Sequence, residues 1–74
     1  MPDFSFPSWY TRMGYPNYRG GQRDCARDLG VTREHVRRLE LGRVEPSATL
    51  ALLCWALEVI KTVAPEHWDA LRAA

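Results

Sequence analysis

Residues Gln22–Leu41 read QRDCARDLGVTREHVRRLEL, and this stretch decides how the chain folds. Apolar residues recur at helical spacing on both sides of Gly30, which predicts one helix over Gln22–Leu29 and a second over Arg33–Leu41. Gly30 can adopt the positive φ that a tight turn needs. The Thr32 hydroxyl can accept a hydrogen bond from a free N–H in the first turn of the second helix. The pattern therefore predicts two helices joined by a short turn.

The two predicted helices carry the residue types that a close crossing needs. Ala26 is small where the second helix crosses the first. The apolar residues that flank the crossing are Cys25, Leu29, Val31, Val36 and Leu39. Four side chains of the second helix then point outward, in the half that enters the major groove in DNA-binding proteins: Arg33, Glu34, Arg37 and Arg38. The spacing favours a DNA-binding helix-turn-helix, and a purely structural hairpin is the alternative.

Positive charge is concentrated around this motif. The net charge of the 74 residues is only +1, but eight of the ten basic residues lie between Arg12 and Arg43. In that stretch they face four acidic residues: Asp24, Asp28, Glu34 and Glu40. Such clustering is typical of a surface that binds phosphate, and equally of a solvated arginine-rich face.

The flanking segments complete an all-α, compact bundle of four to five helices. A short helix is expected over Pro7–Met13, with its apolar face formed by Phe6, Trp9, Tyr10 and Met13, and a loop is expected over Tyr15–Gly21. Ser47 can cap a long helix over Ala48–Val63. A last helix is expected over Glu66–Leu71, after Pro65, with three inward contacts: His67, Trp68 and Leu71.

The helix over Ala48–Val63 is apolar on two opposite sides. One side carries Leu50, Leu53, Cys54, Leu57 and Ile60, which suits a core. The other begins at Ala48 and continues through the residues that we expect to form a dimer interface: Leu52, Trp55, Val59 and Val63. A surface helix of a small monomer needs only one apolar stripe. The second stripe therefore favours self-association over residues 47–72, and cover by the N-terminal helix or the C-terminal segment is the alternative.

The stretch Gln22–Leu57 resembles the XRE/Cro-repressor-like family of phage and bacterial transcriptional regulators. The resemblance rests on QRDCARDLGVTREHVRRLELG, then on Glu40-Leu41-Gly42-Arg43, Pro46, Leu50 and Leu53. It implies a lambda-repressor-like fold and repression by a homodimer on a palindromic DNA operator. A chain as short as this one resembles two kinds of small family member. One is the phage autorepressor, including those encoded beside anti-CRISPR genes, and the other is the antitoxin. The short, proline-flanked first helix and the long loop before Gln22 depart from the family pattern.

The resemblance also assigns roles to individual residues. DNA base contacts are expected from Arg33, Glu34 and Arg38. DNA backbone contacts are expected from Arg19, Gln22, Arg23, Thr32, Arg37 and Arg43. In this family, a glutamate at the place of Glu40 often pairs with an arginine of the first helix. Arg12 is the candidate partner in this chain. Glu34 has the alternative of pairing with Arg37 or Arg38 on its own helix.

Other classes of protein find little support. No nucleophile–base pair or phosphate-cradling loop is present, so we expect no enzyme, cofactor, metal or small-molecule substrate. Asp24 and Asp28 fit a mixed-charge surface, and the two cysteines fit buried thiols. The start of the chain does not resemble a signal peptide and no stretch is long enough for a membrane span, so a cytoplasmic protein is expected. The residues thus favour a DNA-binding autorepressor, with an antitoxin or adaptor that binds another protein as the alternative.

Overall fold

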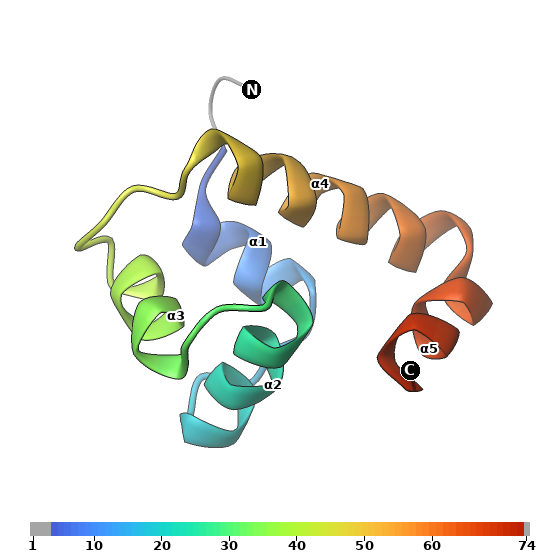
Figure 1. The fold of residues 1–74 in the computed structure, drawn as a ribbon, viewed down its shortest axis with the longest axis horizontal. Helices are drawn as coiled ribbons and strands as arrows, with labels where there is room; N and C mark the ends of the chain where they lie inside the picture. The colour runs from blue at the N-terminus through green and yellow to red at the C-terminus, as the bar shows by residue number, and fades with distance from the viewer. Residues whose placement is uncertain (1–3, 74) are drawn as a thin grey trace.

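The computed structural model describes residues 4–73. The expectation that the start of the chain is not a signal peptide lies partly outside the described residues, because it includes residues 1–3. Within residues 4–73 the chain forms an all-α bundle without strands. The helices are α1 (Phe6–Arg12), α2 (Arg19–Leu29), α3 (Arg33–Glu40), α4 (Ala48–Val63) and α5 (Pro65–Ala73). The long α4 runs across the top, with α1 beneath it and α2 and α3 below and to one side (Figure 1). The all-α fold class is therefore confirmed.

Side-chain caps begin three of the helices, as local sequence requires. The Thr32 hydroxyl accepts from the His35 backbone N–H at 3.1 Å, and the Ser47 hydroxyl accepts from that of Leu50 at 3.1 Å. Ser5 caps α1 by a longer contact to the Ser8 N–H, at 3.4 Å. Gly30 ends α2 with a φ of 71°, which confirms the predicted turn. The predicted α4 matches the observed bounds, while α3 ends one residue earlier than expected, at Glu40.

Trp9 lies at the centre of the core with no exposed surface. Its indole N–H donates to the Cys54 backbone oxygen at 2.8 Å, so α1 is joined to the middle of α4 by a buried hydrogen bond. The predicted inward face of α1 is buried in full, as are Cys25 and Cys54. The other buried members of the cluster are Ala26, Leu29, Val36, Leu39, Leu50, Leu57 and Trp68. This core draws on every helix of the described chain.

The start of α2 was predicted wrongly. The helix begins at Arg19 rather than Gln22, so Gly20 and Gly21 belong to its first turn and not to a loop. Gly21 is buried beside the Pro16 backbone, where an added Cβ would lie 2.1 Å from the carbonyl oxygen. The glycine is therefore needed for a close approach of two backbone segments.

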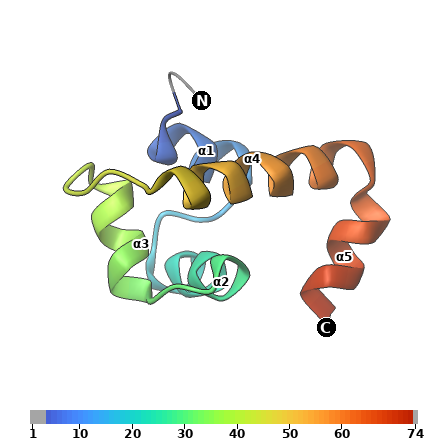
Figure 2. The same cartoon turned by 45° about the horizontal axis from the view of Figure 1, so that its top comes forward.

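The C-terminal helix and α4 also depart from expectation. Of the three inward contacts predicted for α5, only Trp68 is buried, because His67 and Leu71 are exposed. Leu53, expected on the inner side of α4, is exposed at its edge. α5 turns down at the far end of α4, as Figure 2 shows, so it covers α4 from below only near its C-terminus.

We predict that Gly21→Ala destabilises the protein by more than about 2 kcal/mol, because the new methyl group would meet backbone atoms that cannot turn away. Gly20→Ala is the matched control one residue earlier. Its Cβ would meet the end of the Tyr18 ring at 2.8 Å, and that side chain can rotate. Its unfolding free energy in urea should stay within about 1 kcal/mol of the parent. Equal losses in the two variants would contradict the role given to the Pro16 contact.

Candidate nucleic-acid interface

The α2–α3 pair is held by a small buried contact. Val36 and Leu39 point from α3 into the core, and Ala26 lies buried where α2 faces them. The Val31 N–H donates to the Ala26 carbonyl at 3.0 Å, which closes the turn around Gly30. The rest of α3 lies at the edge of the molecule, with Glu34, Arg37 and Arg38 exposed and Arg33 half-buried. Three of the four residues predicted to point outward are therefore exposed, whereas Arg33 is partly covered.

Gln22 links the start of α2 to both ends of α3. Its side-chain oxygen accepts from the Arg33 guanidinium at 3.4 Å, and its amide nitrogen donates to the Glu40 carboxylate at 3.4 Å. Arg33 and Glu40 are seven residues apart, so they share one face of the helix. Gln22 therefore orients α3 against α2 and limits the positions of the Arg33 side chain. The seven-residue spacing was a signal for this bridge that the sequence reasoning did not use.

Two exposed acidic residues of α2 and α3 are already paired. Glu34 pairs with Arg38 at 3.5 Å, and Asp24 pairs with Arg27 at 3.6 Å. Both are exposed pairs within one helix, which add little stability. Five arginines have no carboxylate within 4.0 Å among residues 4–73: Arg19, Arg23, Arg33, Arg37 and Arg43. These five lie on α2, on α3 and in the loop that follows, a segment in which seven arginines outnumber five acidic residues.

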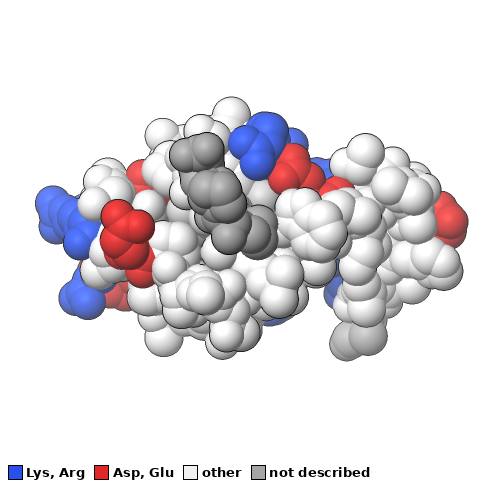
Figure 3. Space-filling view, turned by 90° about the horizontal axis from the view of Figure 1, so that it is seen from above, with Lys and Arg blue, Asp and Glu red and all other residues white. Residues whose placement is uncertain are grey.

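Charge is distributed unevenly over the molecule. In the view from above, basic and acidic groups lie together at the end where α3 and the loop after it lie, while much of the visible middle of the molecule is uncharged (Figure 3). Charged groups are therefore distributed unevenly over this face.

Arg12 was expected to pair with Glu40, but the structure gives it another partner. Its guanidinium donates to both carboxylate oxygens of Glu58 on α4, at 2.8 and 3.1 Å. The hydrogen bond from Arg12 lowers the pKa of Glu58. Arg12 stands at the end of α1 that runs beneath α4, which explains the choice of partner. Glu40 is contacted by Gln22 instead.

Asp28 was expected to belong to a mixed-charge surface, but its side chain is largely buried. Its side chain is 7% exposed, accepts a hydrogen bond from the Tyr15 hydroxyl at 2.6 Å and pairs with Arg72 of α5 at 3.4 Å. Burial, and then this hydrogen bond, raise the pKa of Tyr15. The Arg72 guanidinium also lies 5.4 Å from the centre of the Trp68 ring. Asp28 therefore anchors α5 to α2 and takes no part in an exposed site.

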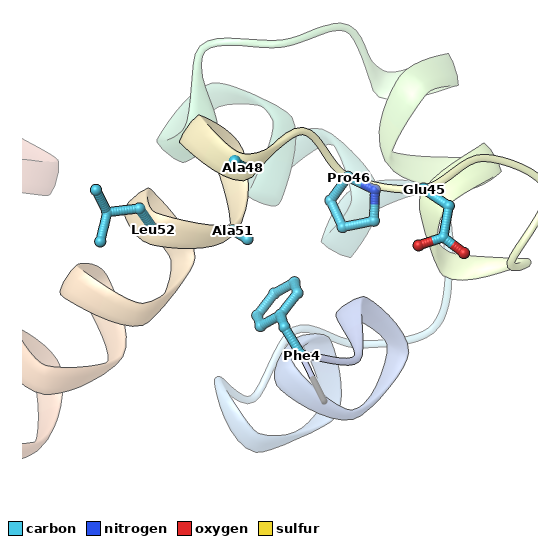
Figure 4. A pocket seen from close by; sticks show the side chains of 6 residues that line it. All are labelled: Phe4, Glu45, Pro46, Ala48, Ala51 and Leu52. Atoms are coloured by element: carbon cyan, nitrogen blue, oxygen red, sulfur yellow. The ribbon is translucent and has the colours of Figure 1, made fainter. Parts of the chain in front are cut away.

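The predicted dimer-interface residues form one exposed stripe along α4. The exposed fractions are 56% for Leu52, 53% for Trp55, 39% for Val59 and 76% for Val63. Beside Leu52, at the start of α4, lies a hollow of about 450 Å³ lined by Phe4, Glu45, Pro46, Ala48, Ala51 and Leu52. Figure 4 shows Phe4 reaching toward Ala51 from the N-terminal segment, with Leu52 and Glu45 on opposite sides of the hollow.

Residues 4–73 contain no group of three or more potential metal ligands among His, Cys, Asp and Glu. Cys25 and Cys54 are free and buried, and burial raises the pKa of Cys54 to about 12.

Over residues 4–73 no helix is both long and apolar enough to cross a membrane. No family model, curated protein or solved structure matches this chain.

We predict that Asp28→Asn costs about 1–3 kcal/mol of unfolding free energy, because it leaves Arg72 and Tyr15 without a buried charged acceptor. Asp24→Asn, four residues earlier on α2, is the matched control and should cost less than about 0.5 kcal/mol, since it removes only an exposed pair. Urea denaturation of both variants measures the difference. If Asp28→Asn were as mild as Asp24→Asn, Asp28 would not anchor α5.

Proposed function

We propose that the protein is a DNA-binding transcriptional repressor that recognises a palindromic operator as a homodimer and represses its own gene. The observation that carries this proposal is the group of five arginines on α2, α3 and the following loop that have no acidic partner among residues 4–73. Guanidinium groups bind phosphates and guanine edges by paired hydrogen bonds. A protein of this function would act in the cytoplasm, where the DNA lies.

The first half of α3 would enter the major groove. Arg33 is suited to the O6 and N7 acceptors of guanine, and its bond to Gln22 restricts the number of orientations that it can take. Glu34 and Arg38 are the other candidate base contacts. Because they form an exposed pair at 3.5 Å, Glu34 would have to give up or share this partner to accept from cytosine N4.

The remaining assigned residues would hold the phosphate backbone. Four arginines would neutralise phosphates without reading sequence: Arg19, Arg23, Arg37 and Arg43. Gln22 and Thr32 stand at or near helix starts on the same pair of helices and would add neutral contacts. The resemblance of Gln22–Leu57 to XRE/Cro-repressor-like proteins supports this arrangement, and the all-α bundle is compatible with it.

A homodimer accounts for the apolar stripe on α4. Two copies related by a two-fold axis would present their α3 helices to successive major grooves, about 34 Å apart, and so would recognise an inverted repeat. The stripe also fits the second candidate, an antitoxin or adaptor that binds a different protein there. Selection of bound duplexes from a randomised DNA pool tests the repressor, which should enrich an inverted repeat, whereas an adaptor that binds only protein should enrich none.

We predict that Arg33→Ala weakens binding to the selected duplex by about 1–3 kcal/mol, which is roughly 5- to 150-fold, and relaxes the preference for one base pair. Arg37→Ala should weaken binding to all duplexes alike and reduce the salt dependence by about one unit of log–log slope. Fluorescence anisotropy titrations at several salt concentrations measure both effects.

Arg12→Ala is the matched control for these variants. It removes the same charge from a residue that is already paired with Glu58, away from α3. Its affinity for the duplex should equal that of the parent. If Arg12→Ala and Arg33→Ala weakened binding equally, the effect would come from net charge, and the assignment of α3 as the reading helix would be wrong.

We predict that Trp55→Glu converts the dimer to a monomer that keeps its helical content, because Trp55 is half-exposed and a buried carboxylate in the contact would be unpaired. Light scattering and circular dichroism measure mass and helicity. Operator affinity should fall at least 10-fold, since each half-site would be bound alone. Thr11→Glu, on the exposed side of α1, is the control and should leave the mass unchanged. An unchanged mass for Trp55→Glu would reject α4 as the interface.

A further inference from the structure

We propose that two copies of this chain pack their α4 helices antiparallel, so that Val63 of each copy enters the hollow beside Leu52 of the other. This inference rests on the proposed homodimer and specifies its geometry. It assigns a second copy of the chain as the occupant of both the stripe and the hollow.

The two charged residues of α4 both have partners at the end of α1. Glu58 is held by Arg12, and the Lys61 ammonium donates to the Met13 backbone oxygen at the end of α1. The other residues of α4 are uncharged. Two such surfaces bring no like charges together, whereas a charged partner would find no complement there.

The stripe can be paired with its own reverse to within one residue. In a two-fold contact, if residue i of one copy meets residue j of the other, then j meets i. Running the helices in opposite directions about a point between residues 57 and 58 brings Leu52 opposite Val63 and Trp55 within one residue of the position opposite Val59. Each pair then joins a larger side chain to a smaller one, which favours close packing. A parallel arrangement would place the two Trp55 rings against each other.

The two ends of the stripe have complementary shapes. Val63 is its most exposed member, at 76%, and the hollow of about 450 Å³ lies at the other end, beside Leu52. Eleven residues of helix separate Leu52 from Val63, which is about 16 Å along the axis. Only the antiparallel arrangement brings a projecting side chain to the hollow, and symmetry makes it do so twice. Glu45 lies on the side of the hollow away from Leu52, at the solvent edge (Figure 4).

The direction of packing can be tested by cross-linking mixed cysteine variants of the full chain. Leu52→Cys carrying a size tag is mixed with untagged Val63→Cys, and the mixture is treated with a short bis-maleimide. Cys25 and Cys54 are buried and should not react in the folded protein. We expect a cross-linked species with one tag from the mixture and none from either variant alone. Leu52→Cys mixed with Thr11→Cys is the control and should give none.

Self-cross-linking of Val63→Cys without a mixed product would overturn the proposal in favour of a parallel dimer. No cross-link in any sample, with circular dichroism and mass showing folded dimers, would place the interface elsewhere and would also overturn it. Folded monomers at high concentration would reject the dimer altogether. DNA titration of the same samples keeps the two proposals separate: cross-linking without selective DNA binding would refute the repressor alone, and selective DNA binding without cross-linking would refute the antiparallel contact alone.

Discussion

The hydrogen bond from the Trp9 indole to the Cys54 carbonyl is the contact on which the rest of the structure depends. It lies at the centre of the core and joins the first helix to the middle of the longest one, 45 residues later. A buried indole N–H needs a partner, and leaving it without one would cost about 1–3 kcal/mol. Because Trp9 and its neighbours on α1 occupy the inner side of α4, the outer apolar stripe has no cover from that helix.

The same packing separates two kinds of surface. Buried apolar residues pack α2 against α3, namely Ala26, Val36 and Leu39. The exposed sides of both helices carry arginines. Two of the acidic residues near those arginines are used within the fold: Asp28 holds α5, and Glu40 is bound by Gln22. A chain with a net charge of +1 can thus present a basic surface at one end and an uncharged one along α4. This division is what a DNA-binding dimer needs, since one surface meets phosphates and the other meets a second copy.

Local features could be predicted from the sequence and long-range ones could not. Thr32, Gly30 and Ser47 act within four residues of their own position, so the helix ends that depend on them were predicted correctly. The two sides of α4 followed from helical periodicity, although Leu53 fell on the wrong side of the boundary. The start of α2 was missed because Gly20 and Gly21 usually mark a loop, whereas here Gly21 permits a backbone contact with Pro16. Glu58 lies 46 residues after Arg12, and Arg72 lies 44 residues after Asp28. At such separations along the sequence, charge alone does not show which residues pair.

Binding of the purified protein to the DNA upstream of its own gene tests the central claim most directly. The titration is made at two salt concentrations, against a scrambled duplex of the same length. The account predicts selective binding that weakens steeply with salt, with a log–log slope of roughly −7 for a dimer in which each copy neutralises four phosphates. Equal, weak affinity for the two duplexes would contradict it and would show that the arginines of α2 and α3 do not form a sequence-reading surface.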